Sequence, residues 1–161
     1  MNKIKTLVLA AAAAVAFNSC TQQNAQKYNE TVVGLYAGYV NNFGNDVNKI
    51  TAEGSTKENA DAALKHMSST TDSCLGVLNG LKPSDDAKDF HNKVVAVLNT
   101  VKTEAIPELQ KLASIKGTDN VDEYNKVIDS YNATSDKISK LEDEAGKAQE
   151  AFAHKVGMKV Q

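Results

Sequence analysis

The residues best suited to metal binding or proton transfer in this sequence are its three histidines, His66, His91 and His154. None of them has a second histidine three or four residues away. Helical zinc sites use pairs such as H-E-x-x-H, and di-iron bundles use repeated Glu-x-x-His pairs. Glu150 and His154 share a helix face, but they form one pair where a di-iron site needs two. We therefore expect no metal site, and we interpret Glu150 and His154 as a solvated ion pair.

Other catalytic and cofactor motifs are missing from the sequence. It contains no C-x-x-C-H haem attachment, no glycine-rich phosphate loop and no G-x-S-x-G nucleophile elbow. The acidic run 142–144 is typical of a solvated helix surface. Asp119, Asp122 and Glu123 lack the glycine and the spacing of a calcium-binding EF-hand loop. The sequence thus predicts a protein that is not an enzyme and that carries no cofactor.

The first twenty residues predict export. Lys3 and Lys5 precede an apolar run over residues 7–17, and the run ends at the small residue Ser19 followed by Cys20. At about eleven residues, the run is shorter than the roughly 20 that span a bilayer. A basic start, a short apolar stretch and small residues at its exit are typical of a signal peptide, which we assign to residues 1–19. The alternative is a buried N-terminal helix.

Residues 16–20, Ala-Phe-Asn-Ser-Cys, resemble the lipobox of bacterial lipoproteins cut by the type II signal peptidase. Ser19 and Cys20 fit the pattern, whereas Phe17 and Asn18 stand where the strict pattern has an aliphatic and then a small residue. The resemblance implies that Cys20 becomes the mature N-terminus. It also implies that Cys20 carries a diacylglycerol on its sulfur and a further acyl chain, such as palmitate, on its amine.

In that family, the residues after the lipidated cysteine influence which membrane the lipoprotein reaches. Thr21 is not the aspartate that typically retains such lipoproteins in the inner membrane, and residues 22–24 lack an acidic cluster that directs some to the cell surface. The resemblance therefore implies an outer-membrane lipoprotein that faces the periplasm. It extends over only about the first 21 residues.

Without residues 1–19 the 161-residue chain keeps 142 residues, which is enough for one domain with a continuous core. We expect a lipidated tether over residues 20–26 and a helical bundle over 27–157. The mature part has 16 lysines against 20 acidic residues and contains no arginine. Nucleic-acid readers carry basic clusters and arginines, so we expect no nucleic-acid partner. Cys74 has no remaining cysteine partner, and its apolar neighbours predict a small buried side chain.

Apolar residues recur at steps of three and four in four long segments, at about 27–52, 57–81, 84–112 and 124–156. The second segment has the regular seam of a coiled coil, which consists of Ala60, Leu64, Met67, Thr71, Cys74, Leu78 and Leu81. Residues 55–58 read as a capping box, and Ser84 and Asn120 read as the caps of the last two helices.

Four long helices with short connections predict an all-α fold, namely an antiparallel up-down four-helix bundle. Pro107 predicts a kink in the third helix near residues 105–106, because proline removes a backbone donor and clashes with the preceding turn. The alternative fold is a three-helix, spectrin-like bundle with one helix lying outside it.

Small and amide side chains form a second strip along the first helix, at Gly34, Gly38, Asn41, Asn45 and Asn48. Glycine costs about 1 kcal/mol relative to alanine inside a helix, so two glycines need an explanation. The simpler interpretation is that a neighbouring helix packs closely on the strip. The functional one is a shallow, uncharged groove that docks a partner.

These observations favour a lipid-anchored, non-enzymatic helical interaction module of the cell envelope, attached through the lipid on Cys20 and binding an envelope protein. The mature part is also loosely similar to the all-helical envelope lipoproteins of Gram-negative bacteria. The alternative is a periplasmic sensor bundle that holds a small apolar molecule, or a non-covalent haem with His91 as one ligand.

Overall fold

The computed structural model describes residues 20–115 and 120–158, with side chains from residue 23 onward. The predicted signal peptide lies outside the described residues. The helices are α1 (Cys20–Thr51), α2 (Lys57–Gly80), α3 (Lys88–Thr100), the π-helical turn η1 (Val101–Ala105), α4 (Ile106–Ile115) and α5 (Val121–Lys155). In the described part of the chain there is no strand, so the predicted all-helical class is confirmed.

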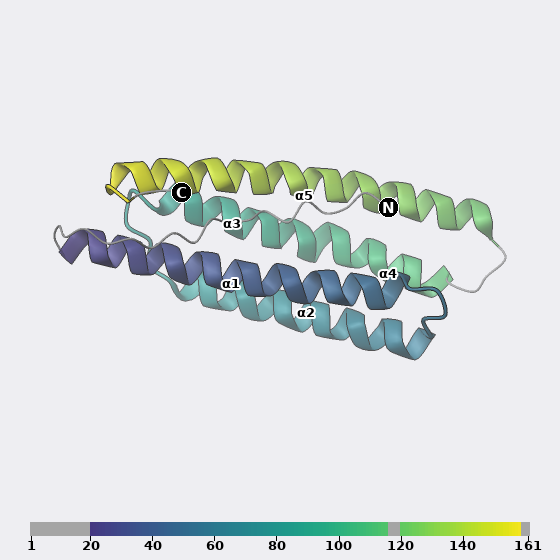
Figure 1. Ribbon diagram of the computed structural model, residues 1–161. Coiled ribbons are helices and arrows are strands. Elements are labelled where there is room, and N and C mark those ends of the chain that lie inside the picture. Colours follow the sequence, from purple (N-terminus) through teal and green to yellow (C-terminus); the bar gives the residue numbers. More distant parts are fainter. Residues whose placement is uncertain (1–19, 116–119, 159–161) are drawn as a thin grey trace.

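Helices α3 and α4 follow one another through η1 along one rod, so the described part of the chain forms four packed helical rods (Figure 1). α1 packs chiefly on α2, α2 packs on the α3–α4 rod, and α5 packs along that same rod. By contrast, α1 makes few close backbone approaches to α5. The three-helix alternative is wrong, because all four rods take part in the packing.

The core follows the predicted stripes. Six of the seven seam positions of α2 are buried, and the seventh, Leu81, is partly buried just beyond the helix end. The α3–α4 rod buries Phe90, Val94, Val97, Leu109 and Leu112. Because each fully buried aliphatic or aromatic side chain contributes about 1.5–3 kcal/mol, these stripes hold the rods together. Cys74 is buried and free, as predicted, and burial raises its pKa to about 11.

Two predicted helix starts need correction, and one agrees with the structure. The N-cap of α2 is Thr56, one residue later than predicted, and its side chain accepts from the Asn59 amide. Ser84 does not cap α3, because it lies in a turn that precedes the helix. Asn120 caps α5 as predicted, since its side-chain oxygen accepts from the Glu123 amide at 3.1 Å.

The first helix is longer than the sequence pattern indicates. α1 begins at Cys20, so the expected tether over residues 20–26 forms its first turns. These residues are polar, so they added no signal to the apolar period that starts near Tyr28. A lipid on Cys20 would thus be attached to the first residue of a helix.

The turn η1 ends two residues before Pro107. Here the amide of Ile106 donates to the carbonyl of Val101, five residues earlier, instead of four. In a regular α-helix the carbonyl four residues before a proline loses its donor. A π-helical turn shifts the bonding pattern locally, as it commonly does where a helix carries an irregularity.

Candidate functional site

A partly enclosed cleft lies between the C-terminal half of α1 and the N-terminal half of α5. Its volume is about 250 Å³. Tyr36, Tyr39, Phe43 and Gly44 line it from α1, whereas Tyr131, Ser135, Ile138 and Glu142 line it from α5. Val101 of η1 completes the apolar lining, and Asn41, Asn45 and Asn48 lie along the α1 side.

The cleft exists because small residues stand where the two helices would otherwise interlock. Ser135 occupies an apolar-stripe position of α5, and Gly44 lines the same cleft from α1. A Cβ at Gly44 would meet no atom within 4 Å. The beginning of α5 is also thinly covered, since Val121 is 65% exposed and Tyr124 is 41% exposed.

Three aromatic rings, each tilted against the next, lie in a row along the α1 side of the cleft. The ring centroids of Tyr36 and Tyr39 are 6.2 Å apart, and those of Tyr39 and Phe43 are 5.9 Å apart. The Thr71 hydroxyl donates to the Met67 carbonyl, so the Tyr39 hydroxyl donates to Thr71 at 3.0 Å. Both buried tyrosines have raised pKa values, chiefly because of burial.

The charged group of the cleft is Glu142, which is only 3% exposed. The Tyr36 hydroxyl donates to one of its carboxylate oxygens at 2.6 Å. Burial raises the pKa of Glu142, the bond from Tyr36 partly opposes this, and the charge of Asp143 adds to it. Among the described residues, no donor is recorded for the second carboxylate oxygen. Because no fully buried side-chain oxygen of these residues lacks a partner, this oxygen keeps some solvent access, and Glu142 lines the cleft.

The expectation that residues 142–144 form a solvated surface is wrong for Glu142. Asp143 and Glu144 are exposed, and Glu144 pairs with Lys93 at 2.5 Å. A signal was present in the sequence, because 135, 138, 142, 145, 149 and 152 follow the three–four step of a seam. The apolar neighbour Leu141 is half-buried beside the core instead.

The strip along α1 is exposed at all five residues, Gly34, Gly38, Asn41, Asn45 and Asn48. A Cβ at Gly34 or Gly38 would meet no atom within 4 Å. No described helix therefore packs against these glycines, which removes the simpler interpretation. The three asparagines line the cleft, and the two glycines extend the strip toward the start of α1.

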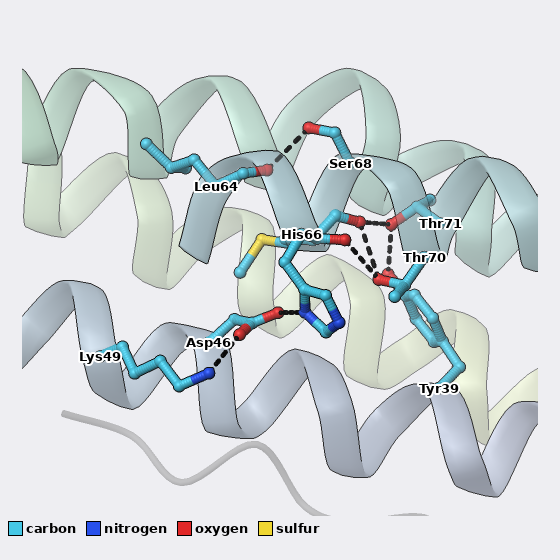
Figure 2. A network of polar contacts seen from close by, with 9 residues as sticks. Tyr39, Asp46, Lys49, Leu64, His66, Ser68, Thr70 and Thr71 are labelled. Atoms are coloured by element: carbon cyan, nitrogen blue, oxygen red, sulfur yellow. Dashed lines mark hydrogen bonds and ion pairs between the residues drawn. The ribbon is translucent and has the colours of Figure 1, made fainter. Parts of the chain in front are cut away.

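A second polar cluster joins α1 to α2 (Figure 2). Asp46 is fully buried, and its two oxygens contact His66 Nδ1 at 2.5 Å and Lys49 Nζ at 3.1 Å. His66 and Lys49 are themselves more than half exposed, so they screen the carboxylate from solvent. Because every oxygen of Asp46 has a partner, this cluster is a structural clamp between the helices.

The remaining histidines also occupy structural or surface positions. His91 does turn inward, but its Nδ1 lies 2.8 Å from the Tyr28 hydroxyl, and burial lowers its pKa. Its neighbour Phe90 stacks on Phe152 with centroids 6.3 Å apart. His154 is exposed. Across residues 20–115 and 120–158, no group of three or more histidine, cysteine or acidic side chains could hold a metal ion.

Comparison with known proteins gives no relative from which a role could be transferred. No protein-family model, curated protein or solved structure matches this chain. None of the described helices combines the length and the apolar character needed to cross a membrane.

Proposed function

We propose that this chain is a lipid-anchored, non-enzymatic interaction module of the cell envelope, attached to the outer membrane through Cys20 and facing the periplasm. The basic start, the apolar run and the Ser19-Cys20 pair support the anchor. Because α1 begins at Cys20, a lipid there would hold the bundle close to the membrane surface.

The proposal includes the antiparallel up-down order of the helices. Support comes from side-chain contacts between α1 and α5, in which residues later in α1 meet residues earlier in α5. Tyr28 meets Phe152 edge-on at 6.2 Å, and farther along α1 the Tyr36 hydroxyl meets Glu142. The proposal also includes a bend of the third rod at Pro107, which the adjacent π-helical turn supports.

The observation that carries the interaction role is the exposed strip of α1. It extends over residues 34–48, about 21 Å at 1.5 Å per residue, and it carries no charge. The two glycines let another backbone approach closely, and the asparagine amides can donate and accept hydrogen bonds. An envelope protein that docks here would bury glycines whose helix-destabilising effect nothing in the described chain offsets.

Site-specific photocrosslinking tests this role in intact cells. We would replace Gly38 of the full chain with p-benzoylphenylalanine, and use Gly76 of α2 as the matched control. Both are exposed helical glycines with open space at the Cβ. The proposal predicts one discrete protein adduct from position 38 and none from position 76. The absence of any adduct, or equal adducts from both positions, would contradict it.

A second candidate function is the binding of a small molecule within the bundle. The cleft between α1 and α5 favours it, because a lining of aromatic rings with one carboxylate among them is typical of ligand sites. The two functions are compatible, since the asparagines belong both to the strip and to the cleft.

A further inference from the structure

The residues that line the cleft between α1 and α5 limit the kind of ligand that it can bind. Its lining contains four aromatic side chains, and Glu142 is its one charged residue. No lysine or histidine lines it, and the ion pairs of the described chain leave Glu142 without a cationic partner. The cleft therefore holds an acidic group whose charge the described residues do not neutralise.

A buried carboxylate without a counterion is unfavourable, because burial removes water from its charged form. Tyr36 supplies one hydrogen bond, whereas the second oxygen of this cleft-lining residue has no recorded donor among the described residues and keeps some solvent access. A ligand that brings positive charge to this oxygen would compensate the lost hydration. Aromatic faces attract the same ligands, since the π-electrons of tyrosine and phenylalanine stabilise nearby cations.

We propose that the α1–α5 cleft binds a small organic ammonium ion with an apolar body, and that Glu142 is its counterion. This inference rests on the small-molecule function proposed above. The ammonium group lies against the free oxygen of Glu142, and the apolar body lies between the rings of Tyr39 and Phe43 on α1 and that of Tyr131 on α5. A space of about 250 Å³ corresponds to roughly eight water molecules, so the ligand has about seven to ten non-hydrogen atoms.

The size of the cleft argues against larger cations. The helices that flank it are held together at Tyr36–Glu142 and again at Asn29–Gln149, where the side chains bond at 3.0 Å. These bonds close one end of the space between α1 and α5. A space of this size favours a compact ammonium ion over a flat or bulky cation.

The test measures choline binding by calorimetry to the full mature protein, purified in a neutral maltoside detergent. Choline is compared with 3,3-dimethylbutan-1-ol, which has the same shape without the charge. We expect choline to bind, and its neutral analogue to bind at least tenfold more weakly. If both bind equally, or if neither binds, the inference is overturned.

Variants locate the binding. We expect Glu142→Gln to weaken choline binding at least tenfold, and Glu144→Gln, which changes an exposed neighbouring acid, to leave it unchanged. Gly44→Leu should abolish binding by filling the cleft, because the Cβ position is open. Circular dichroism of each variant establishes that it is folded. Unchanged binding in folded Glu142→Gln or Gly44→Leu would overturn the proposed site.

The two experiments distinguish a failure of the ligand proposal from a failure of the protein-partner proposal. Loss of choline binding with an intact crosslink at Gly38 would reject the ligand alone. Choline binding that depends on Glu142, without any crosslink at Gly38, would reject the protein partner and leave the ligand site in place.

Discussion

Glu142 stands at a core position of α5 although its side chain is ionisable. The seam of α5 carries serine, glutamate and glutamine at positions 135, 142 and 149, and all three are buried. Two of them bond across to α1, through Tyr36 and Asn29. α1 and α5 are thus joined in part by hydrogen bonds between buried side chains. Such bonds specify which side chains meet, because each buried polar group needs its partner.

The raised pKa of Glu142 makes a prediction about stability and pH. Its folded pKa lies above the ordinary value of 4.5, so between these two values the folded state binds more protons than the unfolded state. The free energy of unfolding therefore falls as the pH rises through this window. Glu142→Gln keeps an acceptor for Tyr36 and removes the charge. We expect the variant to be more stable than wild type at about pH 7, and equal to it near about pH 4.

Urea denaturation at both pH values measures this difference. Glu144→Gln is the control, since Glu144 is solvent-exposed and its bond with Lys93 lowers its pKa. The control should show no gain at neutral pH. A Glu142→Gln protein no more stable than wild type at about pH 7 would show that the buried carboxylate is not a destabilising element.

At the scale of the helices, the apolar periods predict most of what is observed. The seam from Ala60 to Leu78 is buried as predicted, and the Asn120 cap forms. The predictions that fail concern mainly polar residues, which do not contribute to an apolar period. Residues 20–26 extend α1 ahead of the apolar stripe that starts near Tyr28, and Ser84 opens a turn, its carbonyl accepting from the Ala87 amide, before α3 begins at Lys88.

The strip on α1 supplies a prediction that separates exposure from packing. Alanine at an exposed helical glycine restricts the unfolded chain and favours the helix, so Gly38→Ala should raise the free energy of unfolding by about 0.5–1 kcal/mol. Gly54 in the α1–α2 turn is the matched contrast, because its φ of +76° disfavours a side chain. Gly54→Ala should lower stability by about 1–2 kcal/mol.

Thermal and urea denaturation of both variants, followed by circular dichroism, provide the comparison. If Gly38→Ala destabilised the protein as Gly54→Ala does, another part of the chain would have to cover the strip. The free surface proposed for a partner would then not exist.

At the scale of the whole molecule, the sequence predicts four helices but not the spacing between them. Each stripe identifies a buried face, yet the gap between α1 and α5 depends on which small residues meet across it. Ser135 and Gly44 lie 91 positions apart, and only the folded chain brings them to one cleft. The same holds for Glu142, whose neighbours in sequence are solvated and whose partner in space is Tyr36 on another rod.

The proposed cellular role depends on the proposed lipid on Cys20. Cys20 is the first residue of α1, so an anchor there would hold the exposed strip and the cleft near the membrane. Alternatively, residues 1–19 stay attached to the chain, or they are removed without lipidation of Cys20. These outcomes differ in the mass and in the lipid content of the protein.

The most direct measurement is labelling of cells with an alkyne palmitate analogue, followed by mass analysis of wild type and Cys20→Ala. Cys74→Ala serves as the control, since it changes the other cysteine of the chain. We expect wild type and Cys74→Ala to carry the label on a mature chain that begins at Cys20. We expect Cys20→Ala to remain an unlabelled, larger precursor. A Cys20→Ala protein that reached the same mature size as wild type, or a wild type that carried no label, would contradict the lipid-anchored account.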